Sequence, residues 1–196
     1  RALASVWPEE DAQRLFHRYH DGERRVQAGS DVAYRLVLRE TLAAIADAEG
    51  LEMPPGREDA LAESLPSWRP FPEVTGSLAE LRDRGWRLAI LSNTDRDLID
   101  ASMETIGVRF DDSIVAGEIG SYKPASRHWE VFRERHGGVE HVHVAQSLFH
   151  DIAPTSDLGI PNVWINRLGE PEDSRPKRTL PSLAGLADTL DELASK

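Results

Sequence analysis

Three apolar runs in the second half of the chain end in polar side chains of types that bind anions. Ser92 and Asn93 follow RLAIL, Lys123 follows SIVAGEIG, and Gln146 and Asp151 follow VHVA. A hydroxyl and backbone N–H groups hold oxygen atoms, an ammonium offsets negative charge, and a carboxylate orients a water or a metal ion. Each signal is weak alone, because Ser-Asn after a strand is usually a helix cap and Lys-Pro is usually a loop. Their joint placement predicts a site for a small anionic organic substrate.

From Pro72 onward the chain alternates between strand and helix patterns, and this alternation would bring those residues together. The expected strands are 87–93, 110–117, 142–146 and 162–166, and the expected helices are 73–85, 97–106, 126–136, a short one ending at Gly159, and 181–196. The run 87–93 is apolar enough for a parallel strand buried on both faces. The alternation predicts an α/β fold with a doubly wound, Rossmann-like parallel sheet. Ligands of such sheets bind at the carboxyl ends of the strands, where the polar residues stand.

The first 66 residues read as helical, with no strand pattern. Helices are expected over 9–26, over 31–49 with Asp31 as the N-cap and Gly50 as the end, and over 57–65. The proline-rich PSWRPFPEV, residues 66–74, is the expected hinge. We therefore expect a helical domain over 1–70 and an α/β domain over 71–196.

Composition limits the classes of partner. The chain has 34 Asp and Glu against 23 Lys and Arg, a formal charge of −11, and we expect no binding to nucleic acid or to an anionic membrane, which needs a basic face. It contains no cysteine, which excludes disulfides, thiolate nucleophiles and cysteine zinc sites and suits the cytoplasm. No apolar run is long enough for a membrane helix, and RALASVWPEEDAQ does not have the pattern of a signal peptide.

The motifs resemble those of the haloacid dehalogenase superfamily over essentially the whole chain. ILSN is similar to the second family motif, SYKP to the third, and VAQSLFHDI stands where the fourth would be, while the helical segment corresponds to the family's cap domain. The stretches around these motifs most resemble the 2-haloacid dehalogenase-like branch. The resemblance implies a hydrolase in which Ser92 and Asn93 hold substrate oxygens, Lys123 pairs with a nucleophilic aspartate, and Asp151 positions the water or a metal. It also implies that Gln146 and Ser147 contact the substrate.

The family's first motif, a strand ending in Asp-x-x-x-Thr that supplies the nucleophile, does not occur in this sequence. In the family that strand lies between the strands that here carry Ser92 and Gln146. A core without it would leave a row of unpaired backbone groups, so we expect roughly twenty further residues before Arg1. A gap of about twice the ~4.8 Å strand spacing between strands 88–92 and 142–146 would support this expectation.

Further departures concern the metal and the substrate. Gln146 stands where family phosphatases place a metal-binding acid, so we expect no required cofactor, and Mg²⁺ only if the protein is a phosphatase. Trp129 replaces a tyrosine common in the dehalogenases six residues after the lysine, and it is retained as a candidate substrate contact. Arg18 is the nearest candidate for the cap arginine that grips the substrate's carboxylate, although a solvated helix arginine is the simpler interpretation.

His141, His143 and His150 could suggest a metal cluster. His141 and His143 share one face of a strand, and without a third ligand at suitable spacing they are more simply packed histidines. We therefore expect no metal site.

Three functions remain open. The first is a dehalogenase-like hydrolase, the second a Mg²⁺-dependent phosphatase of the same fold, and the third a catalytically silent anion-binding module. The helical domain is the expected surface for a homodimer.

Overall fold

The structure is a computed structural model that describes residues 2–28, 30–171, 173 and 175–194. The last two residues of the expected helix 181–196 lie outside the described residues. The chain forms two compact units. The helical unit comprises Arg1–Trp68, Ser92–Ser102 and Val115–Tyr122, and the sheet unit comprises Arg69–Leu91, Met103–Ile114 and Lys123–Lys196. The chain first passes from one unit to the other after Trp68, inside the expected hinge.

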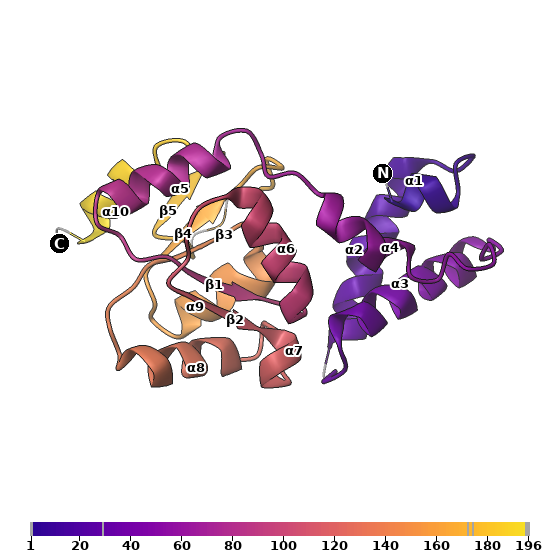
Figure 1. The fold of residues 1–196 in the computed structure, drawn as a ribbon, viewed down its shortest axis with the longest axis horizontal. Coiled ribbons are helices and arrows are strands. Elements are labelled where there is room, and N and C mark those ends of the chain that lie inside the picture. Colours follow the sequence, from indigo (N-terminus) through magenta and orange to yellow (C-terminus); the bar gives the residue numbers. More distant parts are fainter. Residues whose placement is uncertain (1, 29, 172, 174, 195–196) are drawn as a thin grey trace. The chain divides into compact units, whose positions relative to one another are not determined.

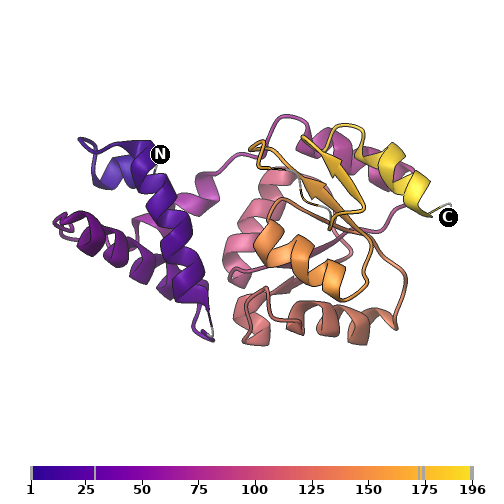
Figure 2. The same cartoon turned by 180° about the vertical axis from the view of Figure 1, so that it is seen from behind.

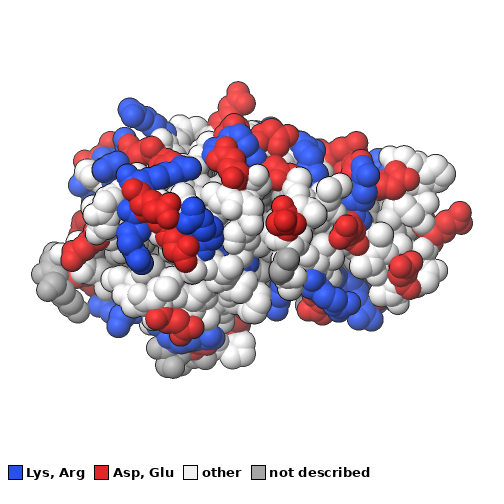
Figure 3. Space-filling model, turned by 90° about the horizontal axis from the view of Figure 1, so that it is seen from below, with Lys and Arg blue, Asp and Glu red and all other residues white. Residues whose placement is uncertain are grey.

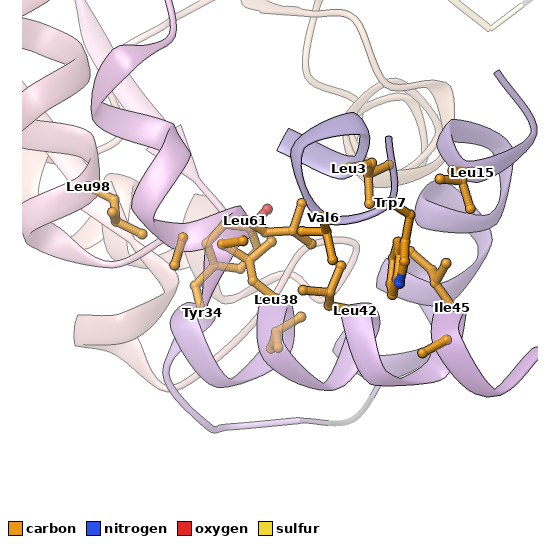
Figure 4. Packing of buried hydrophobic residues seen from close by; sticks show 14 of the residues in the cluster. Leu3, Val6, Trp7, Leu15, Tyr34, Leu38, Leu42, Ile45, Leu61 and Leu98 are labelled. Atoms are coloured by element: carbon orange, nitrogen blue, oxygen red, sulfur yellow. The ribbon is translucent and has the colours of Figure 1, made fainter. Parts of the chain in front are cut away.

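The helical unit is built on helices that pack their apolar sides together. Its elements are α1 (Ala2–Val6), α2 (Ala12–Gln27), α3 (Tyr34–Glu49), α4 (Ala60–Ser64), a 3-10 turn (Leu65–Ser67), the start of α6 (Arg96–Ile106) and α7 (Ala116–Ile119). Leu15, Val37 and Leu42 are fully buried in its core. Figure 4 shows Leu3, Val6 and Leu42 turned toward one another between the helices. The short helices α1 and α7 were not expected from the sequence.

The start of α3 differs from the prediction. The helix begins at Tyr34, its N-cap position is Ala33, and that residue makes no side-chain cap, so the prediction of Asp31 as N-cap was wrong. Asp95 caps the helix instead, because its two carboxylate oxygens accept hydrogen bonds from the N–H groups of Tyr34 (2.9 Å) and Arg35 (3.0 Å). The helix ends, as predicted, at Gly50, which has a left-handed φ of 65°.

The sheet unit contains the α/β core, and the predicted doubly wound architecture is confirmed. Its strands are β1 (Ala89–Ser92), β2 (Asp112–Val115), β3 (His143–Ala145), β4 (Asn162–Ile165) and β5 (Arg178–Leu180). β3 pairs in parallel with β4, and β4 in parallel with β5. In Figure 1, α5 (Val74–Asp83) and α10 (Leu186–Ala194) lie on one side of the strands, and α8 (Arg127–His136) and α9 (Ala153–Asp157) lie on the other, as Figure 2 also shows from behind. The second apolar core lies under α5 and α10 and includes Leu81, Val163 and Leu186.

The described strands form two sheets rather than one. One has the order β1-β2 and the other the order β3-β4-β5, so β1 and β3 each have a strand on one side only. β4, which lies between two strands, is fully buried, whereas Ala89 of β1 is exposed and the rest of β1 is half-buried. The expectation that residues 87–93 form a strand buried on both faces was therefore wrong, because Ala89 is exposed and no residue of β1 is fully buried.

Neither the charge on the face that Figure 3 draws nor the hydropathy of the described helices points to a membrane or a nucleic acid. On the face drawn in Figure 3, acidic and basic side chains are interspersed rather than separated into regions of one sign. Within the described residues, no helix is both long enough and apolar enough to cross a membrane.

Candidate active site

Lys123 lies at the carboxyl ends of two strands and connects them. Its ammonium donates a 2.7 Å hydrogen bond to the carbonyl oxygen of Leu91 in β1 and a 2.6 Å hydrogen bond to Asp151 Oδ1 beyond β3. The lysine is only 7% exposed and Asp151 only 6%. A buried lysine needs such partners, since an unpaired ammonium would be costly to remove from water. Two residues predicted from their positions after apolar runs are thus in direct contact.

Asp151 is held in a turn that follows β3. The π-helical turn covers Leu148–Ile152, and Ser147 caps its start by accepting a hydrogen bond from the His150 N–H at 3.1 Å. Burial alone would raise the pKa of Asp151, but the charge of Lys123 and the hydrogen bond with His143 outweigh burial and hold this pKa well below its usual range. The carboxylate is therefore ionised at neutral pH.

His143 belongs to the site, although its position in the sequence did not indicate this. It is buried in β3, and its Nε2 lies 2.9 Å from Asp151 Oδ1, while its Nδ1 lies 3.5 Å from the indole Nε1 of Trp129. Residue spacing gave only the alternation of His141 and His143 along a strand. The signal that could have singled out His143 is its position just before the polar loop, but no sequence pattern shows the turn that brings Asp151 back to it.

A cavity of about 720 Å³ lies between β1 and β3 in the sheet unit. The stretches 88–91 and 142–145 line its two sides, and Lys123 and Asp151 also line it. The apolar side chains of Leu81 and Leu186 contribute to the same wall. The cavity thus lies between a strand of each described sheet.

Ser92 and Asn93 belong to the helical unit, although they follow β1 directly in the chain. Asn93 donates a 3.0 Å hydrogen bond from Nδ2 to Oε1 of the buried Gln27 in α2. In the same unit Arg18 forms a 2.6 Å ion pair with Glu49 at the end of α3. This partner favours the simpler interpretation of Arg18 as a helix-surface residue, and its role in substrate binding stays a prediction.

The remaining predicted contacts belong to the sheet unit. Gln146 is exposed, and its backbone carbonyl oxygen accepts a 2.9 Å hydrogen bond from the Trp164 indole. Ser147 Oγ is 3.0 Å from His150 Nδ1, so its hydroxyl is engaged within the turn. Trp129 is 1% exposed and its indole contacts His143, so it packs in the core beside that histidine. Its role as a substrate contact stays a prediction.

The three histidines do not form a metal centre. His143 contacts Asp151, His150 contacts Ser147, and His141 packs its ring against Phe132. Across the part of the chain that the structure describes, no group of three or more His, Cys, Asp or Glu could hold a metal ion.

This arrangement can stabilise an anion and hold a water. A buried ammonium at the carboxyl ends of two strands stabilises negative charge on a neighbouring group, and an ionised carboxylate beside it accepts a hydrogen bond from water. Both groups line the cavity, so a reacting group placed there would meet them.

Comparison with known proteins shows a relationship to one enzyme family. A model of the haloacid dehalogenase-like hydrolases matches residues 2–145. The (S)-2-haloacid dehalogenase of Pseudomonas sp. (strain YL) is 31% identical over 153 residues, which are 75% of this chain and 66% of that protein. Haloacetate dehalogenase H-2 of Moraxella sp. (strain B) is 34% identical over 122 residues, which are 61% of this chain and 54% of that protein. The chain thus spans between about half and two thirds of the length of these relatives.

Solved structures share the fold. The L-2-haloacid dehalogenase of Xanthobacter autotrophicus superimposes with a TM-score of 0.84 at 19% sequence identity, over 97% of this chain and 91% of that one. At this identity the likeness shows a common fold.

Proposed function

On the premise that this chain belongs to the haloacid dehalogenase-like hydrolase family, we propose that the protein removes halide from small 2-halogenated carboxylic acids by hydrolysis. The names of the two related dehalogenases support this substrate class. The observation that carries the proposal is the buried Lys123–Asp151 pair, which also reaches the carbonyl oxygen of Leu91.

The proposed nucleophile is an aspartate on a strand between β1 and β3, outside the described residues. Two observations support this location: β1 and β3 belong to different sheets, and the cavity between them has Lys123 and Asp151 in its lining. A strand seated there would hydrogen-bond to both neighbouring edges. Its carboxyl end would then deliver an aspartate to the ammonium of Lys123, which would keep that aspartate ionised.

The reaction proceeds in two displacements. The aspartate oxygen attacks C2 of the substrate, a C–O bond forms as the carbon–halogen bond breaks, and halide leaves with the bonding electrons. Water then attacks the carbonyl carbon of the resulting ester, which releases a 2-hydroxy acid and a proton and regenerates the aspartate. Lys123 offsets the charge that develops on the ester oxygens, and Asp151 orients the attacking water. We assign Ser92 and Asn93 to the substrate's carboxylate.

The donor set of the described site argues against a resident Mg²⁺. Gln146 supplies a neutral amide where a carboxylate would bind the ion, and the described hydrogen bonds of Asp151 commit its Oδ1 to Lys123 and His143. We therefore propose that the reaction needs no metal.

A panel of substrates tests the proposal. The full-length protein is assayed for halide release from 2-chloropropionate and chloroacetate, and for phosphate release from p-nitrophenyl phosphate, with EDTA and with added Mg²⁺. We expect halide release that EDTA does not change. Phosphate release that requires Mg²⁺, without halide release, would replace the proposal with a phosphatase. Release of neither product would favour a silent anion-binding module.

A further inference from the structure

His143 has two partners that together determine where its proton lies. We propose that His143 is a positioning residue: Trp129 holds it as the Nε2–H tautomer, and in this form it fixes Asp151 for the hydrolytic step. The catalytic consequence rests on the proposed function, whereas the protonation state of the ring does not.

The tautomer follows from the chemistry of the indole. A tryptophan indole can donate a hydrogen bond but cannot accept one. Because Trp129 Nε1 faces His143 Nδ1 at 3.5 Å, Nδ1 must be the acceptor and the ring proton must be on Nε2. Nε2 then donates to Asp151 Oδ1 at 2.9 Å. A proton on Nδ1 would place two N–H groups against each other, so the buried indole disfavours the tautomer that carries its proton on Nδ1.

The consequence for Asp151 is a fixed orientation. Lys123 and His143 both donate to Oδ1, from separate parts of the sheet unit, at 2.6 Å and 2.9 Å. Together, the Lys123 ammonium and the His143 ring fix the plane of the Asp151 carboxylate. The ammonium alone can rotate, so with Lys123 as the single donor the carboxylate could turn. The described hydrogen bonds therefore converge on Oδ1, and Oδ2 is the oxygen that we assign to the attacking water.

A direct catalytic role for His143 fits the geometry less well. Its Nε2 is engaged with Asp151 and its Nδ1 faces Trp129, so neither nitrogen is directed at a substrate. The residue lines the cavity but acts through the carboxylate. The same contacts argue against metal ligation, which would need one of these nitrogens.

Nitrogen-15 NMR of the histidine rings tests the tautomer without any substrate. We expect the His143 ring at neutral pH to carry its proton on Nε2 in the wild type. In Trp129→Phe, which keeps an aromatic ring but removes the N–H, we expect a measurable population of the other tautomer. A wild-type ring protonated on Nδ1, or on both nitrogens, would overturn the inference.

Kinetics test the positioning role. His143→Leu removes the donor, and we expect kcat for halide release to fall about 10- to 100-fold with KM changed less than about threefold, as for other residues that orient a catalytic group. His143→Gln retains an N–H donor near the position of Nε2 and should restore most of kcat. The control, His141→Gln, changes a histidine that has no described bond to Asp151 and should match the wild type.

The possible failures are distinguishable. Equal loss in the Leu and Gln variants, or an effect on KM alone, would overturn the positioning role. A wild-type protein that releases no halide but carries its proton on Nε2 would overturn the proposed function and leave the tautomer assignment standing.

Discussion

Lys123 illustrates how a buried charge becomes tolerable. Removing an ammonium and a carboxylate from water costs several kcal/mol per ion, and their attraction repays this cost only where the geometry is good. Here the ammonium reaches both a carbonyl oxygen and a carboxylate at distances of 2.7 Å and 2.6 Å. Such a pair adds little net stability over an apolar pair, but removing one partner leaves the other charge buried.

The substitution Lys123→Met should therefore damage both stability and activity. We expect a loss of about 3–5 kcal/mol in the free energy of unfolding, measured by urea denaturation, because the Asp151 carboxylate stays buried without its cation. Halide release should fall about 100- to 1000-fold. The control is Lys177→Met at an exposed lysine, which should change the free energy of unfolding by less than about 0.5 kcal/mol. Equal effects of the two substitutions would contradict the importance of the buried pair.

Asp151 should also make stability depend on pH. Its pKa is depressed in the folded protein, since the charge of Lys123 and the His143 hydrogen bond outweigh the effect of burial. A depressed pKa stabilises the fold fully above the unfolded-state value of about 3.9, and this contribution is lost as the pH falls toward the folded-state value. The stability advantage of the wild type over Asp151→Asn should be constant between about pH 5 and 7 and shrink below about pH 4. Urea denaturation across this range is the measurement, and an advantage that grows on acidification would contradict it.

The site residues were predicted from the sequence because they directly follow apolar runs. This reasoning selected Lys123 and Asp151, which the structure joins, because the carboxyl ends of parallel strands share one edge. It could not select His143, whose contact with Asp151 depends on a π-helical turn, or predict the full burial of Trp129, which depends on how α8 packs. Those contacts depend on side-chain geometry that residue spacing does not contain.

At the scale of elements, helix α3 depends on a cap from far away in the sequence. The sequence offered Asp31 as the local N-cap, but Asp95 fills this role across 60 residues. Gly117 allows the approach, because a Cβ atom there would lie 2.6 Å from Asp95 Oδ1. Local patterns predict a helix and its approximate limits, whereas a cap supplied by another segment cannot be predicted from the helix's own residues.

Asp95→Ala should lower the free energy of unfolding by about 1 kcal/mol, with a range of about 0.5–2 kcal/mol, because two N–H groups at the start of α3 lose their acceptor. Urea denaturation followed by circular dichroism measures the change. Asp97→Ala is the matched control, because Asp97 is exposed and pairs only with the side chain of Arg35 among its described ion pairs. We expect the control to lose less than about 1 kcal/mol. A larger loss in the control than in Asp95→Ala would contradict the capping role.

At the scale of the whole chain, the order of helices and strands was predictable and the pairing of the strands was not. The alternation of patterns indicated an α/β fold, and the strands β1 to β4 lie where apolar runs were found. The short edge strand β5 was missed because RTL is too short and too polar to form a pattern. The half-burial of β1 was missed because burial depends on which elements pack around a strand, and among the described strands β1 pairs only with β2.

The burial of Lys123 should make its side chain react more slowly with acylating reagents than an exposed lysine does. The sequence has only three lysines, Lys123, Lys177 and Lys196, and Lys123 is 7% exposed and ion-paired. Acylating reagents attack neutral, accessible amines, so the exposed Lys177 should be modified well before Lys123. Mass spectrometry of a partially acylated sample would then report the integrity of the site at a single residue, because Lys123 becomes reactive only when its enclosure opens.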